Sequence, residues 1–92
     1  MAKRRNKIEI MKDILIVIKD KNGKIKPTHI LYKSNLSHQM MELYLNEMKS
    51  KRFIREEPLS DGKRTFFITD RGIMFLDQYR SINSFMESFG LD

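Results

Sequence analysis

The sequence of 92 residues contains no cysteine, only two histidines and only four glycines. Without cysteine it forms no disulfide and has no thiol nucleophile, and His29 and His38 lack the spacing of a helical metal-binding pair. The glycines form no phosphate-binding loop. We therefore expect a protein that is not an enzyme and that requires no cofactor and no metal.

Long hydrophobic runs are also missing. The longest one, residues 14–18, has five residues, whereas a membrane-spanning helix needs roughly 20. The basic start at residues 1–7 resembles the first part of a signal peptide, but Glu9, Lys12 and Asp13 interrupt the apolar segment that should follow. We expect a cytoplasmic protein without membrane contact.

Positive charge is concentrated at the beginning of the sequence. Residues 1–35 hold ten basic and three acidic residues, a net charge of +7, and the remaining residues sum to −1. Because lysine and arginine release counterions when they contact phosphate, this half fits a polyanionic partner. The alternative is a basic segment that serves only solubility.

Three helices are predicted in this basic half and just after it. Asn6 caps the first, which ends near residue 21 before Asn22 and Gly23, and a short strand with Ile25 inward follows at residues 24–26. Thr28 caps the second helix, next to Pro27. Ser37 caps the third, which ends near residue 51. The expected core positions of these helices are Ile8, Met11, Ile14, Leu15, Ile18, Ile30, Leu31, Tyr32, Met40, Met41, Tyr44, Leu45 and Met48.

A hairpin and a long helix are predicted in the rest of the sequence. Two β-prone runs, residues 53–56 and 65–68, flank a turn that contains Pro58 and Gly62. Thr69 then caps a helix that runs from Asp70 to about residue 89, with Gly72 allowing close packing in its first turn. The fold class is therefore mainly α with a small β-hairpin.

This order of elements, helix-turn-helix followed by a hairpin, is that of a winged helix-turn-helix with a long C-terminal helix. We expect residues 1–92 to form a single domain, because the chain is too short for two cores. Within it, residues 1–5 form a flexible basic arm, residues 6–69 the winged helix and residues 70–90 a dimerisation helix.

The last helix carries a heptad pattern that favours a homodimer. Its apolar positions are spaced 4, 3, 4 and 3 residues apart, and one small domain cannot cover a helix of that length. The alternative is that the helix folds back on the first helix of its own chain. The predicted dimerisation residues are Phe75, Tyr79, Ile82, Phe85, Met86 and Phe89.

The third helix is the candidate DNA-reading element. Gln39 and Asn46 have the side chains that pair with adenine, while His38 suits guanine or a phosphate. Ser37 at the helix N-terminus suits a phosphate oxygen. Glu42 is on the same face and repels phosphate unless it accepts from cytosine or pairs with a basic side chain. Predicted contacts to the DNA backbone are Lys26, Thr28, Lys33, Lys49, Lys63, Arg64, Arg4 and Arg5.

The sequence resembles the small archaeal winged-helix DNA-binding proteins that end in a dimerising helix. The resemblance is based on residues 7–15, on residues 25–37 with their Pro-Thr, Tyr-Lys and Asn-Leu-Ser steps, on Tyr44-Leu45 and on residues 66–72. It implies a homodimer, joined by an antiparallel coiled coil, that binds double-stranded DNA as a transcription regulator or as a chromatin-type protein associated with the nucleoid.

Three functions remain open at this point. The first is sequence-specific binding of double-stranded DNA by a homodimeric transcription regulator. The second is non-specific binding by an architectural protein, which differs only in its specificity ratio. The third is a protein-protein interaction module, which Glu42 favours slightly and the basic N-terminal half does not.

Overall fold

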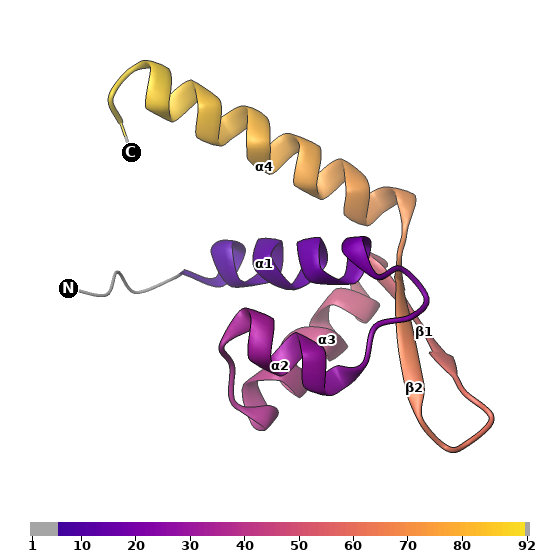
Figure 1. Ribbon diagram of the computed structural model, residues 1–92. Coiled ribbons are helices and arrows are strands. Elements are labelled where there is room, and N and C mark those ends of the chain that lie inside the picture. The colour runs from indigo at the N-terminus through magenta and orange to yellow at the C-terminus, as the bar shows by residue number, and fades with distance from the viewer. Residues whose placement is uncertain (1–5, 92) are drawn as a thin grey trace.

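The computed structural model describes residues 6–91 and has the predicted fold class, mainly helical with one two-stranded antiparallel hairpin (Figure 1). Its order of elements is helix, helix, helix, hairpin, helix. The elements are α1 Lys7–Asp20, α2 Pro27–Ser34, α3 His38–Ser50, β1 Ile54–Pro58, β2 Arg64–Ile68 and α4 Asp70–Ser88.

Side-chain caps fix the start of three helices. The Asn6 side chain accepts a hydrogen bond from the backbone N–H of Glu9, the Ser37 hydroxyl accepts one from Met40, and the Thr69 hydroxyl accepts one from Gly72. The predicted caps of α1, α3 and α4 are thus confirmed. The prediction for α2 was wrong: Lys26 is its N-cap and makes no side-chain cap, and Thr28 is already helical.

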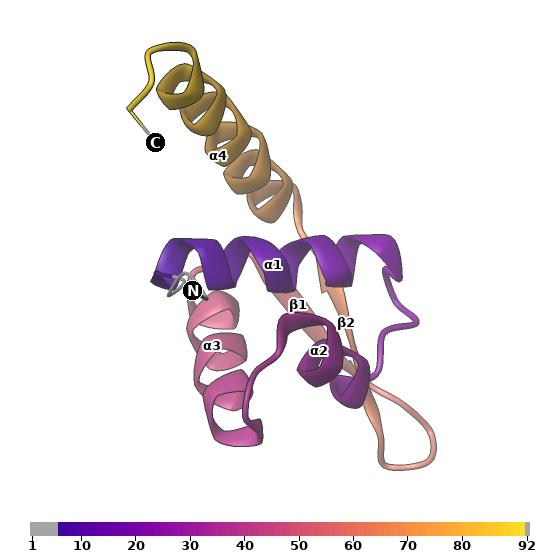
Figure 2. The ribbon, with the colours of Figure 1, turned by 60° about the vertical axis from the view of Figure 1, so that its left-hand side comes forward.

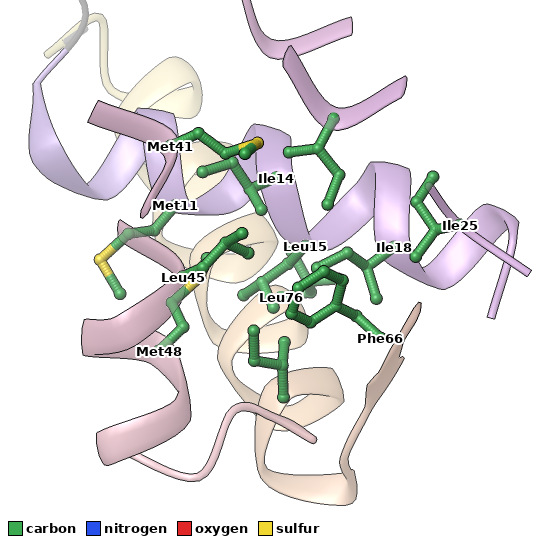
Figure 3. Close-up of a cluster of buried hydrophobic side chains, with 12 residues drawn as sticks. Met11, Ile14, Leu15, Ile18, Ile25, Met41, Leu45, Met48, Phe66 and Leu76 are labelled. Atoms are coloured by element: carbon green, nitrogen blue, oxygen red, sulfur yellow. The ribbon is translucent and has the colours of Figure 1, made fainter. Parts of the chain in front are cut away.

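The core lies between α1, α2, α3, the hairpin and the start of α4 (Figure 3). Helix α1 supplies its largest share, because its apolar residues recur at helical spacing and face the other elements. The buried hydrophobic residues are Met11, Ile14, Leu15, Ile18, Ile25, Ile30, Met41, Leu45, Met48, Ile54, Phe66 and Leu76.

Three residues that we assigned to the core lie outside it. Tyr32 is 86% exposed, because the buried residues of α2, Ile30 and Ser34, lie on the opposite side of that short helix. Met40 is exposed at the edge of the buried side of α3, and Ile8 is exposed in the first turn of α1. The outer surface of α2 and α3 therefore carries apolar as well as polar side chains.

The hairpin is longer than predicted and is held to the loop after α1. Ile54 pairs with Ile68 and Pro58 with Arg64. Residues 24–26 are not a strand: Gly23 makes one backbone hydrogen bond to β2, and the Thr65 hydroxyl, in place of a backbone N–H, donates to the carbonyl of Ile25. A side-chain hydrogen bond thus takes the place of the backbone hydrogen bond that would have added residues 24–26 to the sheet.

Helix α4 is anchored at its first turn. The Thr69 N–H donates to the carbonyl of Phe53 over 3.0 Å, and the Thr69 hydroxyl donates to the carbonyl of Arg52. A Cβ on Gly72 would lie 2.3 Å from the Phe53 oxygen, so that only glycine fits without a shift. The ring of Phe75 packs on Phe53 with centroids 5.1 Å apart. These contacts set the direction in which α4 leaves the domain.

The far half of α4 extends beyond the rest of the chain, as both views of the ribbon show (Figures 1 and 2). The ring of Tyr79 is half-buried and lies 5.6 Å from the ammonium group of Lys12 on α1. Beyond it, Ile82 and Phe85 are each 58% exposed and Phe89 is 68% exposed. The distal residues therefore do not fold back on α1. Among residues 6–91 no helix is long and apolar enough to cross a lipid bilayer.

Candidate nucleic-acid interface

The turn between α2 and α3 is short and well defined. Asn35 adopts the left-handed conformation, with φ 53° and ψ 53°, which asparagine tolerates better than most residues. The N–H of Leu36 then donates to the carbonyl of Leu31 over 3.2 Å, and Ser37 opens α3. Only three residues separate the helices, so the turn fixes the direction of α3 relative to α2.

The outer face of α3 carries Gln39, Leu43 and Asn46, which are all exposed. Their spacing of i, i+4 and i+7 puts them on one side of the helix, opposite the buried Met41, Leu45 and Met48. We predicted Gln39 and Asn46 as reading residues but missed Leu43. The signal was available, since Leu43 falls on the polar side of the helical pattern.

The start of α3 and the tip of the hairpin lie on the same side of the molecule (Figures 1 and 2). In both views this side is opposite α4. Ser37 and His38 are exposed at that end of α3. The outer surface of α3 and the hairpin tip can thus meet one extended partner while α4 stays clear of it.

A cluster of four charged side chains links α3 to the hairpin. Arg64 on β2 donates to both carboxylate oxygens of Glu42 and, over 3.1 Å, to Oε1 of Glu56. Lys49 Nζ is also 3.1 Å from Glu56 Oε1. The cluster has no net charge, and each of its side chains is only about 28 to 32% exposed. Glu42 is therefore neutralised by a basic partner, and the predicted backbone contacts Lys49 and Arg64 have partners within the chain.

The cluster also shifts the pKa values of Glu56 and Arg64. Partial burial raises the pKa of Glu56, but the hydrogen bonds and charges of Lys49 and Arg64 outweigh it, so that this pKa lies below its ordinary value of 4.5. The carboxylate of Glu42 raises the pKa of Arg64. Both shifts favour the charged form of the group, and the resulting ion pairs hold the hairpin against α3.

The tip of the hairpin carries Lys63, one of the predicted contacts to the DNA backbone. Its N–H donates to Asp61 Oδ1 over 3.2 Å, and its ammonium group is 3.6 Å from Asp61 Oδ2, with the side chain 67% exposed. The backbone hydrogen bond from Lys63 lowers the pKa of Asp61. Gly62 has φ +80° in this turn, a conformation that suits glycine. Lys63 is thus exposed in the turn at the tip of the wing.

Around α2 the structure brings several further predicted residues together. Lys26, Thr28 and Lys33 are exposed, and Lys26 and Thr28 line a hollow of about 320 Å³ at the start of the helix. The other residues that line this hollow are Lys21, Lys24, His29 and Tyr32. We did not predict Lys21, Lys24 or Tyr32 as part of the site. Arg4 and Arg5 lie outside the described residues.

The described residues, 6–91, contain no group of three or more His, Asp or Glu side chains placed to hold a metal ion. His29 is half-buried on α2, and His38 is exposed at the start of α3. The chemistry that this surface offers is hydrogen bonding by amides, a hydroxyl and an imidazole, beside ammonium groups at its edges.

The fold and this surface define a helix-turn-helix protein with a wing. Consistent with this, the chain belongs to the winged helix-turn-helix family, whose model matches residues 4–87. No curated protein sequence matches the chain.

Solved structures of other proteins share this fold. Sso10a-2, a DNA-binding protein from Sulfolobus solfataricus, superposes with a TM-score of 0.79 and 19% identity over 92% of this chain and 85% of its own. MepR, a transcription regulator of the Staphylococcus aureus multidrug efflux pump MepA, superposes with a TM-score of 0.74 and 16% identity over 87% of this chain. FabT from Streptococcus pneumoniae, solved in complex with DNA, superposes with a TM-score of 0.67 and 15% identity over 92% of this chain. The match spans only 60% of MepR and 59% of FabT.

Proposed function

We propose that this protein binds double-stranded DNA with sequence preference, as a homodimeric winged-helix transcription regulator in the cytoplasm, associated with the nucleoid. The observation that carries the proposal is the outer face of α3, where Gln39 and Asn46 are exposed on a helix that begins on the same side as the wing tip. The known functions of the similar folds support it, since Sso10a-2 is a DNA-binding protein and FabT was solved with DNA.

In this proposal α3 enters the major groove. Gln39 and Asn46 each pair with an adenine through the two groups of the side-chain amide, and His38 bonds a guanine or a phosphate. The Ser37 hydroxyl and backbone N–H groups at the start of α3 donate to a phosphate oxygen. The cations at the edges then hold the duplex without reading its sequence: Lys26 and Lys33 with Thr28 beside α2, Lys63 on the wing, and Arg4 and Arg5 in the N-terminal arm.

The charged cluster removes an objection to this function. A free carboxylate on the reading face would repel phosphate, but Glu42 is bonded to Arg64. Because Glu42 is paired in this way, it no longer favours a protein partner over DNA. We propose that Lys49 and Arg64 act mainly by holding the wing in place beside α3, and approach the backbone from there.

The dimer in this proposal forms through α4. Phe75 and Tyr79 are half-buried against their own chain, whereas Ile82, Phe85 and Phe89 are exposed and Met86 is half-buried. Pairing these distal residues with a second copy removes their apolar surface from water, which is the dominant favourable term in association. Two copies related by a two-fold axis bind half-sites about one or two helical turns apart, roughly 10 or 20 base pairs.

The test is a titration of the full chain against genomic fragments and against a random duplex at two salt concentrations. A regulator prefers particular genomic fragments at both salt concentrations. A steep salt dependence without preference indicates the architectural alternative, and no binding in dilute buffer indicates a protein-interaction module.

The reading face is tested by Gln39→Ala combined with Asn46→Ala. The control is Gln78→Ala, which removes an exposed amide from α4. Loss of preference in the first variant and its retention in the control support the proposal. Equal preference in both variants argues against α3 as the recognition helix.

A further inference from the structure

We propose that Leu43 contacts the 5-methyl group of thymine, and that together with Gln39 and Asn46 it makes A·T base pairs the preferred centre of each half-site. The inference rests on the proposed function, because it requires α3 to lie in the major groove. It goes further in naming the class of base pair that is selected and a residue that selects it.

The position of Leu43 is the first observation. Its side chain is 58% exposed, and it lies between Gln39 and Asn46 on one side of α3. Single exposed leucines are common on protein surfaces and need no special explanation. Leu43 is different because it lies in the middle of the outer face of α3, between two residues with amide side chains.

The chemistry of that stripe matches one kind of base pair. In the major groove an A·T pair presents the N7 and N6 groups of adenine, which suit an amide, together with the methyl group of thymine, which suits an apolar side chain. A G·C pair presents no methyl group and is read by arginine, lysine or a carboxylate. The order amide, leucine, amide therefore complements successive A·T pairs.

The charged groups on α3 that could read G·C are engaged elsewhere, and His38, which could bond a guanine, lies off this stripe at the start of the helix. Lys49 is the only lysine or arginine within His38–Ser50, and its ammonium group bonds Glu56. The carboxylate of Glu42, which could accept from cytosine, bonds Arg64. The charged cluster thus keeps these two side chains beside the wing and leaves Gln39, Leu43 and Asn46 as the face that meets the bases.

A replacement of thymine by uracil tests the methyl contact directly, because it removes the methyl group and leaves base pairing intact. The probes are a 20-base-pair duplex of mixed A·T sequence, the same duplex with deoxyuridine for every thymidine, and a G·C duplex of equal length. Binding is measured at one fixed salt concentration for the wild-type chain, for Leu43→Ala and for Ile16→Ala. Ile16 is an exposed apolar residue of α1 and serves as the matched control.

We expect the wild type to bind the A·T duplex more tightly than the G·C duplex. Loss of each contacted methyl group weakens binding about fourfold. Leu43→Ala should bind the thymine and uracil duplexes equally, while Ile16→Ala should keep the wild-type ratio. In a second probe, 7-deazaadenine removes the N7 acceptor, which should weaken wild-type binding about tenfold and the double variant of Gln39→Ala and Asn46→Ala much less.

Two results would overturn the inference and leave the proposed function intact: equal wild-type affinity for the thymine and uracil duplexes, or an unchanged ratio in Leu43→Ala. In the second case Leu43, with the exposed Met40 beside it, would be assigned to a protein contact. Failure of the wild type to bind any duplex in dilute buffer would overturn both the inference and the proposed function.

Discussion

Arg64 illustrates how a residue's neighbours decide its use. From sequence it was a cation beside the tip of the hairpin and therefore a predicted contact to the DNA backbone. In the structure its guanidinium bonds two carboxylates from two elements, Glu42 of α3 and Glu56 of β1. Such pairs contribute modest stability at partly exposed sites, but their geometry holds the wing at one distance from α3.

The pH dependence of stability should show this cluster. Because the pKa of Glu56 is lower in the folded protein than its ordinary value of 4.5, the stabilisation is fully present above pH 4.5 and is lost as the pH falls through the folded pKa. Glu56→Gln should remove that part of the acid destabilisation. We expect an effect of at most about 1 kcal/mol at a site one-third exposed.

This is measured by urea unfolding from pH 7 to pH 3 at fixed protein concentration. Glu57→Gln is the control, because Glu57 pairs with Arg55 away from the cluster. If the Glu56 and Glu57 variants lose stability in parallel as the pH falls, the cluster does not have the role assigned to it.

Gly72 provides a second prediction at the scale of one residue. In Gly72→Ala the new methyl group would lie 2.3 Å from the carbonyl oxygen of Phe53, a backbone atom, so the first turn of α4 must move. We expect a loss of about 1 to 3 kcal/mol in the free energy of unfolding. Ser81→Ala, at an exposed position further along α4, should change it by less than about 0.5 kcal/mol. Equal stability of the two variants in urea would contradict the close packing.

At the scale of elements, the wing and α3 have different expected roles. The outer face of α3 presents amides and a leucine, whereas the wing tip presents Lys63 on a turn that Gly62 makes possible. Amides distinguish bases and a single ammonium group does not, so substitutions in the two elements should have different consequences for binding.

Lys63→Gln should therefore weaken binding to all duplexes by a similar factor and reduce the salt dependence of binding by about one unit of log K against log salt. The comparison is Lys51→Gln, an exposed lysine at the opposite end of α3. Binding isotherms at three or more salt concentrations give the slope. A change in sequence preference, or the same slope change in both variants, would refute the backbone role of Lys63.

For the whole molecule, the direction of α4 determines what a second copy can meet. The contacts of Thr69 and Gly72 with residues 52 and 53 hold the first turn of α4. The distal half of the helix then extends away from the side that carries the start of α3 and the hairpin tip. A Schellman motif ends the helix, with the N–H of Leu91 bonded to the carbonyl of Met86 and Gly90 at φ +66°. The exposed apolar stretch before it is where we expect the partner.

We predict that replacing Ile82, Phe85 and Phe89 together by serine converts the proposed dimer into a folded monomer. These side chains are exposed in the single chain, so the change removes surface from the interface and leaves the core intact. The monomer should bind a two-half-site duplex much more weakly, because it loses the effective concentration of the second half. Sedimentation gives the mass and circular dichroism the helix content. Ile8→Ser, which alters an exposed apolar residue of α1, should remain dimeric; a dimeric triple variant would disprove the α4 interface.

The sequence by itself determined the order of elements, the caps of α1, α3 and α4 and most of the core, because these depend on local spacing and on side chains that bond backbone three residues away. Tertiary structure decided the features that join distant residues. Examples are the pairing of Glu42 with Arg64, which are 22 residues apart, the failure of residues 24–26 to form a strand, and the exposure of Tyr32. Linear spacing does not specify which elements meet, and a charge is free or engaged only according to what folds beside it.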